Sequence, residues 1–313
     1  MIILFMFLGL LALVLINVPI AVALAVVASA AMVFAHGPDV LPNVALVMMD
    51  GATNFPLIAI PLFILAGAIM NSTGISRRLI AFASAIFGFV KGGLAMVNIG
   101  TSLFFAEISG SAVADVAALG SILIPSMKKK GYPAPFAAAV TSSSATLAVI
   151  IPPSIPMILY AVMAQSSVVQ LFVAGIVPGV LGGFLMMVVA HRFAVHYNYP
   201  VEEVFKVSQV VATFKNAALA FTLPLIILGG IFGGFVTATE GAGLAVVAAM
   251  VIGAIYRELD WPHLKQAMID GSVQTAVVML LVASSVLIGE YLTEAQVPQT
   301  LADGISNITQ NKY

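Results

Sequence analysis

The stretch SLFFAEISGSAVADVAALGSILIP, residues 102–125, is apolar enough to enter a lipid bilayer, yet its centre carries polar and ionisable residues. These are Glu107, Ser109, Gly110, Ser111 and Asp115. Such groups inside a membrane segment are costly and usually mark the path of an ion or a substrate. Gly110 also weakens a helix, because glycine is conformationally loose and the flanking serines compete for backbone hydrogen bonds. The stretch therefore predicts a helix–turn–helix hairpin whose tip lies inside the membrane.

A second stretch, TSSSATLAVIIPPSIP at residues 141–156, is predicted to face this hairpin as a broken helix. Each of its three prolines lacks an N–H and clashes with the preceding turn of a helix. The residue before a proline is also pushed towards extended backbone. Carbonyl groups near residues 148–153 are therefore left for another partner. A simple kink between packed helices is the alternative, and two adjacent prolines with a third close by favour a true break.

The composition places the chain among membrane proteins that cross the bilayer several times. Of its 313 residues, 61% are hydrophobic and 8% are charged, and its mean hydropathy is +1.13, whereas a soluble domain carries about 25% charged residues. The net charge of −1 argues against nucleic acid as a partner. The absence of cysteine excludes disulfides and thiolate metal sites. No Ser/His/Asp set and no phosphate-binding glycine loop is evident, so we expect neither an enzyme nor an ATP-driven pump.

Apolar runs predict the spans and polar runs predict the loops between them. For residues 1–35 we favour one tilted helix, because no basic residue marks an end inside that run. Two short helices joined by a turn at Asn17 and Pro19 are the alternative. Residues 36–54 and 290–313 are expected to be loops. Further membrane segments are predicted at residues 55–70, 171–190, 217–236, 244–256 and 267–289.

Basic residues predict how the chain crosses the membrane. They flank the hairpin on both sides, at Arg77, Arg78 and Lys91 before it and at residues 128–130 after it. Cytoplasmic loops collect Lys and Arg, so both ends of the hairpin should be cytoplasmic. The polar, glycine-containing middle then favours re-entry over two full crossings. In the resulting topology all Lys and Arg residues except Lys312 lie on the cytoplasmic side.

The order of these elements predicts an inverted repeat. A first series of span, span, hairpin, broken helix and span is followed, from about residue 239 to residue 289, by the start of the same series in the opposite orientation. Transporters are often built in this way, with binding sites on discontinuous helices. We divide the chain into N-terminal membrane helices (1–91), hairpin and discontinuous helix (92–163), connecting helices (164–236) and the start of the second repeat (237–313).

The hairpin tip is a candidate ion site. Ser109 and Ser111 can offer hydroxyl oxygens beside the freed carbonyls, and hard cations such as sodium take oxygen ligands. Packing of small residues between helices is the alternative interpretation. Glu107 suits either cation coupling or a hydrogen bond to neighbouring backbone, and for Asp115, which lies past the tip, we favour a structural role. The four histidines fall in loops, so no metal site is predicted.

Several motifs together resemble a known family. They are NIGTSLFFAEISGSAVADVAALGSILIPSMKKKGY at residues 98–132, FAAAV at 136–140 and IIPPSIPMILY at 150–160, with GISRRLI at 74–80, YREL at 256–259 and VPQ at 297–299. This pattern resembles the large membrane subunit of tripartite ATP-independent periplasmic (TRAP) transporters along the whole chain. The resemblance implies an all-α, elevator-type inverted-repeat transporter with re-entrant hairpins. It also implies sodium-driven uptake of an organic acid anion of the C4-dicarboxylate or sialic acid type.

The resemblance also implies site residues. The first sodium ion would be held by the hydroxyls of Ser109 and Ser111 and the carbonyls of Ala148, Ile151 and Pro153, and the substrate by Gly110 and Ser154. Sodium is then the coupling ion, and no other cofactor is expected. The sequence departs from the family pattern at Ala148, usually glycine, and at Val149, usually proline. Family members continue with a second hairpin, so we expect the second repeat to be incomplete here.

The predicted function is therefore that of the membrane subunit of a sodium-coupled secondary transporter. Its expected partners are a small TRAP membrane subunit, a periplasmic solute-binding protein, the organic anion and the lipid bilayer. The expected location is the bacterial inner membrane, with several spans. A non-transporting scaffold or channel-like membrane subunit is the alternative.

Overall fold

The computed structural model describes residues 2–202 and 204–308, except for the side chains of residues 107–109, 301 and 304–308. In these ranges every regular element is a helix and no strand occurs. Five described segments are long and apolar enough to cross a membrane, and a bent pair, Ala134–Ile150 with Ile155–Met163, would make a sixth. The five are Phe55–Ser72, Val168–His196, Val207–Phe232, Ala238–Ile255 and Trp261–Glu294. The prediction of an all-α protein with several membrane spans is confirmed.

The chain forms two compact units, Met1–Asn54 with Gln274–Tyr313 and, between them in sequence, Phe55–Val273. Helix α14 (Trp261–Glu294) contributes its first part to the second unit and the rest to the first. The predicted division into four segments, and the elevator-type inverted repeat, stay predictions.

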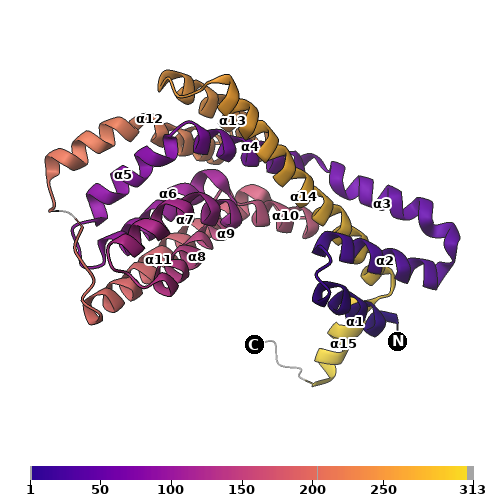
Figure 1. Ribbon diagram of the computed structural model, residues 1–313. Helices are drawn as coiled ribbons and strands as arrows, with labels where there is room; N and C mark the ends of the chain where they lie inside the picture. The colour runs from indigo at the N-terminus through magenta and orange to yellow at the C-terminus, as the bar shows by residue number, and fades with distance from the viewer. Residues whose placement is uncertain (1, 203, 309–313) are drawn as a thin grey trace. The chain divides into compact units, whose positions relative to one another are not determined.

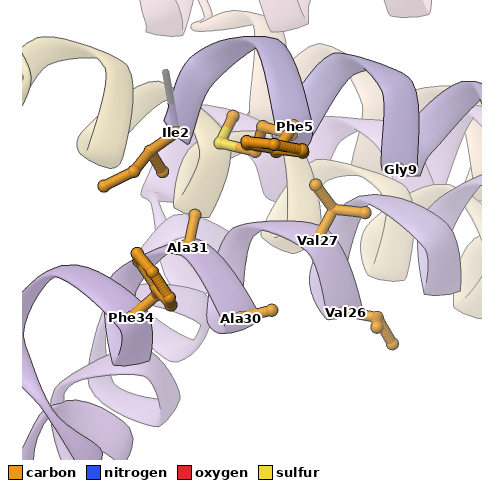
Figure 2. Close-up of a pocket in the computed structure, with 9 residues that line it drawn as sticks. Ile2, Phe5, Gly9, Val26, Val27, Ala30, Ala31 and Phe34 are labelled. Carbon is orange, nitrogen blue, oxygen red and sulfur yellow. The ribbon is translucent and has the colours of Figure 1, made fainter.

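The first unit begins with two short helices, so the favoured prediction of one helix over residues 1–35 is wrong and the alternative of two helices is confirmed. Helix α1 (Ile2–Leu15) ends at a turn in which Asn17 has φ +66°, and α2 (Ile20–His36) starts after Pro19. Asparagine tolerates this left-handed conformation, and proline fixes the entry to the next helix. The two helices pack against each other along an apolar groove of about 510 Å³ (Figure 2).

Two segments predicted as loops are largely helical, so those predictions are also wrong. In the run predicted as a loop over residues 36–54, a short 3₁₀ turn (Pro38–Val40) leads into α3 (Leu41–Thr53). A side chain at Gly51 of α3 would collide with Val286, so α3 approaches α14 closely at this point. In the run 290–313, α14 continues to Glu294 and α15 spans Val297–Ile308. The polar residues in these two runs are compatible with helix, so polarity alone did not mark them as loops.

The second unit has a core that the sequence predicts only in part. After a 3₁₀ turn (Phe55–Ile58), α4 (Ala59–Ser72) packs on α13 (Ala238–Ile255). Helix α5 (Ile75–Phe87) was not predicted. It buries Ile75, Leu79 and Ala83, which recur every four residues, and packs on α6 and on α12 (Val207–Phe232). This spacing is the signature of an amphipathic helix.

The predicted hairpin and broken helix form a bundle within this unit (Figure 1). Its helices are α6 (Gly93–Ser109), α7 (Ala112–Lys129), α8 (Ala134–Ala145), α9 (Leu147–Ile150), α10 (Ile155–Met163) and α11 (Val168–His196). Helix α6 packs on α7, α8, α9 and α11. The bundle therefore holds the hairpin directly against the broken helix.

Candidate functional site

The hairpin turns at Gly110 and Ser111, as the sequence predicts. Gly110 has φ +58°, a left-handed conformation that glycine adopts without steric cost. Ser111 caps α7, because its Oγ accepts a hydrogen bond of 3.4 Å from the backbone N of Ala114. The helix–turn–helix prediction is confirmed, while re-entry into the membrane stays a prediction.

The broken helix opens between Ile150 and Ile155, again as predicted. Its two parts are bent by 42°. Ser154 caps the second part in the same way as Ser111 caps α7: its Oγ accepts from the backbone N of Met157 at 3.4 Å and donates to the Val149 carbonyl at 2.6 Å. The Pro152–Pro153 peptide bond is cis. A packed kink without a break, the alternative that the sequence left open, is excluded by the extended backbone at Ile151 and Ser154.

The hairpin tip and the break of the helix are in direct contact. The backbone N of Ile155 donates a 3.2 Å hydrogen bond to the Gly110 carbonyl. A Cβ atom at Gly110 would lie 2.7 Å from the Pro153 carbonyl oxygen, closer than real side chains approach. Glycine is therefore needed at the tip both for the backbone conformation and for the close approach.

Three carbonyls at the break lose the donors that a regular helix would supply. The Ala148 carbonyl would accept from residue 152, but Pro152 has no N–H. In a regular helix the N–H of Ile155 would donate to the Ile151 carbonyl, but here it donates to the Gly110 carbonyl. Likewise, the N–H of Met157 would donate to the Pro153 carbonyl, but here it donates to the Ser154 hydroxyl. These are the three carbonyls assigned to sodium from the resemblance.

The structure brings most of the predicted site residues together at this junction. Gly110, Ala148, Ile151, Pro153 and Ser154 are all buried there. Ser111 belongs to the same junction as the cap that follows Gly110. The side chains of Glu107 and Ser109 lie outside the described residues. Sodium and substrate binding by these residues stay predictions.

Asp115 lies in the first turn of α7 and is buried, with 1% of its surface exposed. A carboxylate in the first turn of a helix is favoured by the partial positive charge of the helix N-terminus. The structural role favoured for Asp115 stays a prediction.

A buried polar cluster between α6 and α8 was missed by the sequence reasoning. Asn98 Nδ2 donates to Thr141 Oγ1 at 2.7 Å, and the hydroxyls of Ser102 and Ser144 bond at 2.9 Å. The Ser144 hydroxyl also lies 3.3 Å from Asn98 Oδ1. The signal was present, because polar residues stand at positions 98, 101, 102 and 141–144 between long apolar runs. These bonds tie the first helix of the hairpin to the first part of the broken helix.

Glycines on α11 bring that helix close to the break. A Cβ at Gly175 would collide with the Ile150 carbonyl, and one at Gly179 would collide with the Ile151 side chain. Small residues at such spacing allow close helix packing in membranes. The break is therefore held by α11 on one side and by the hairpin tip on another.

Both ends of the hairpin contact one short segment that follows α11. The N of Gly92 donates to the Pro200 carbonyl at 3.1 Å, and the N of Glu202 donates to the Gly88 carbonyl at 3.1 Å. At the other end, Lys130 forms a 2.9 Å ion pair with Glu202. The two ends therefore lie together, as a hairpin requires.

Comparisons with known proteins agree with this architecture. The family model described as "Tripartite ATP-independent periplasmic transporter, DctM component" matches residues 7–313. The C4-dicarboxylate TRAP transporter large permease protein DctM of Pseudomonas aeruginosa is 38% identical over 90% of this chain and 66% of its own length. The 2,3-diketo-L-gulonate TRAP transporter large permease protein YiaN of Escherichia coli is 38% identical over 95% of this chain and 70% of its own.

A third relative carries another substrate in its name. The sialic acid TRAP transporter permease protein SiaT of Haemophilus influenzae is 38% identical over 80% of this chain and 41% of its own length. The chain spans about two thirds or less of the length of most of the curated relatives that it matches. It belongs to the DctM family, the large permease component of tripartite ATP-independent periplasmic transporters, and is a multi-pass protein of the bacterial inner membrane and not an enzyme.

Proposed function

We propose that this chain forms the ion-binding and substrate-binding part of a sodium-coupled importer of an organic acid anion. The importer would receive its substrate from a periplasmic binding protein and would include a small membrane subunit. The contact between Gly110 and Ile155 carries the proposal, because it joins the hairpin tip to the carbonyls that have lost their helical donors.

Sodium would bind at the junction through oxygen atoms alone. The carbonyls of Ala148, Ile151 and Pro153 would supply three ligands, and Ser109 and Ser111 would supply hydroxyls. A hydroxyl oxygen has two lone pairs, so Ser111 can cap α7 and still coordinate an ion. Carbonyl dipoles that converge in a low-dielectric interior without a partner are unfavourable, and the ion would therefore hold the tip against the break.

The substrate would bind beside this ion. Helices α7 and α10 begin directly after their capping residues Ser111 and Ser154, next to the contact between the tip and the break. The N-terminus of a helix carries partial positive charge and favours anions. Three relatives are named for C4-dicarboxylate, sialic acid and 2,3-diketo-L-gulonate, and all three of these compounds are organic acid anions. An anion held near Gly110 and Ser154 would thus be coupled to sodium through the same backbone.

The sodium dependence of uptake tests this proposal. In proteoliposomes that contain the complete transporter, Ser111→Ala should raise the sodium concentration for half-maximal uptake by about threefold to tenfold, because one ligand is lost. Ser126→Ala, which removes a hydroxyl that bonds to the Ile122 carbonyl of the same helix, is the matched control and should leave the sodium curve unchanged. Protein levels are matched in both cases.

Two outcomes would contradict the proposal. A sodium curve for Ser111→Ala that equals the parent curve would remove Ser111 from the ion site. Uptake in the parent that does not depend on sodium would contradict sodium coupling, and absent or purely passive uptake would favour the scaffold or channel-like alternative.

A further inference from the structure

A basic pocket lies in the second unit, outside the site described above. Its volume is about 590 Å³. Helix α5, helix α12 and the segment that follows α13 line it, through Arg77, Arg78, Ala81, Thr213, Lys215, Asn216, Tyr256 and Glu258. These elements are far apart in sequence, so the pocket forms only when the chain is folded.

The side chains that form its wall are held in place by one another. Arg78 donates to Glu258 Oε1 at 2.8 Å and to the Gly74 carbonyl at 3.1 Å, and its guanidinium lies 3.8 Å from the ring centre of Tyr256. The Tyr256 hydroxyl donates to the Asn216 carbonyl at 2.9 Å. Stacking and several hydrogen bonds fix the plane of Arg78, and the wall is therefore arranged before any ligand binds.

The pocket carries an excess of positive charge. Glu258 is shared by two arginines, since Arg77 lies 3.2 Å from its second oxygen. The bond from Arg78 holds the pKa of Glu258 below its usual range, so this carboxylate stays charged at neutral pH. Lys215 is exposed and forms no ion pair within the part of the chain that the structure describes. Three cations thus face one carboxylate.

The pocket lies where spans end. Helix α13 stops at Ile255 and α14 starts at Trp261, which is 71% exposed. Trp261 is the single tryptophan of the chain, and tryptophan collects at the level of the lipid headgroups. Because Lys and Arg collect in cytoplasmic loops, the basic residues predict that this level lies on the cytoplasmic side.

We propose that the basic pocket binds the phosphate group of an anionic phospholipid from the adjacent leaflet. Arg77, whose side chain is 73% exposed, and Lys215 would donate to the phosphate oxygens. Arg78 and Glu258 would position Arg77 and would not be the main ligands. Basic pockets between membrane helices suit anionic headgroups, and the lipid would bridge α5 and α12.

Lipid binding to the delipidated full chain in detergent tests this inference. Native mass spectrometry gives the affinities for phosphatidylglycerol and, in parallel, for phosphatidylcholine, which has a phosphate but no net charge. Phosphatidylglycerol should bind more tightly. Arg77→Gln and Lys215→Gln should each weaken its binding by about fivefold, because each removes one cation near the headgroup.

The control variant is Lys129→Gln, which removes one charge from an exposed lysine at the end of α7. It should change phosphatidylglycerol binding by less than about twofold. Circular dichroism confirms that each variant is folded. Equal binding of the two lipids, or an equal loss in Lys129→Gln and the pocket variants, would overturn the inference. Displacement of the lipid by millimolar inorganic phosphate would also overturn it and assign the pocket to a soluble anion.

Discussion

The two breaks in the candidate site are built from opposite backbone chemistry. The hairpin breaks at Gly110, which adopts a left-handed conformation and lets another backbone approach. The helix breaks at Pro152 and Pro153, which remove donors and leave carbonyls. Yet each break ends in a serine that caps the next helix. The difference indicates two roles. The break at glycine lets the hairpin tip approach the broken helix closely, while the break at the prolines supplies backbone carbonyl oxygens without helical donors.

The largest effect is expected from Gly110→Ala. The methyl group would meet the Pro153 carbonyl, and alanine would be strained at φ +58°. Strain and overpacking together should lower the free energy of unfolding by about 2–4 kcal/mol. Denaturant unfolding in detergent measures it. Gly243→Ala, at a helical site with open space around it, should cost nothing. Equal effects at both positions would show that the tip does not need glycine.

The two capping serines should differ in a measurable way. Ser111→Ala should lower the free energy of unfolding by about 1 kcal/mol, the usual cost of a lost cap. Ser154→Ala should cost about 2 kcal/mol, because the Val149 carbonyl also loses its 2.6 Å hydrogen bond. The same unfolding assay compares them. A loss at Ser154 that does not exceed the usual cost of a cap would show that the bond to the Val149 carbonyl adds no stability.

Pro152→Ala is expected to have the smallest effect on stability. Its measurable effect should be weaker sodium binding. The new N–H at position 152 could bond to the Ala148 carbonyl and compete with sodium for it. The sodium concentration for half-maximal uptake should rise by about threefold to tenfold. Uptake measured in proteoliposomes at increasing sodium concentration gives this shift. An unchanged sodium curve would show that the Ala148 carbonyl is not a sodium ligand.

Local chemistry allowed the hairpin and the broken helix to be predicted from sequence. Gly110 between two serines, and three prolines within five residues, act on the backbone wherever the rest of the chain lies. The same approach failed where packing decides the outcome. It gave one helix for residues 1–35 because hydropathy does not register the left-handed turn at Asn17, and it missed α3 because its helical state depends on contacts such as Gly51 with Val286.

The sequence by itself determined that this is an all-α membrane protein and where its helices break, because hydropathy and the backbone limits of glycine and proline are local properties. Only the tertiary structure decided which groups meet across those breaks. The bond from Ile155 to Gly110 joins residues 45 positions apart, and that from Asn98 to Thr141 joins two helices. The ion pair of Arg78 with Glu258 spans 180 positions. Such pairings depend on how the helices pack, which no local pattern in the chain specifies.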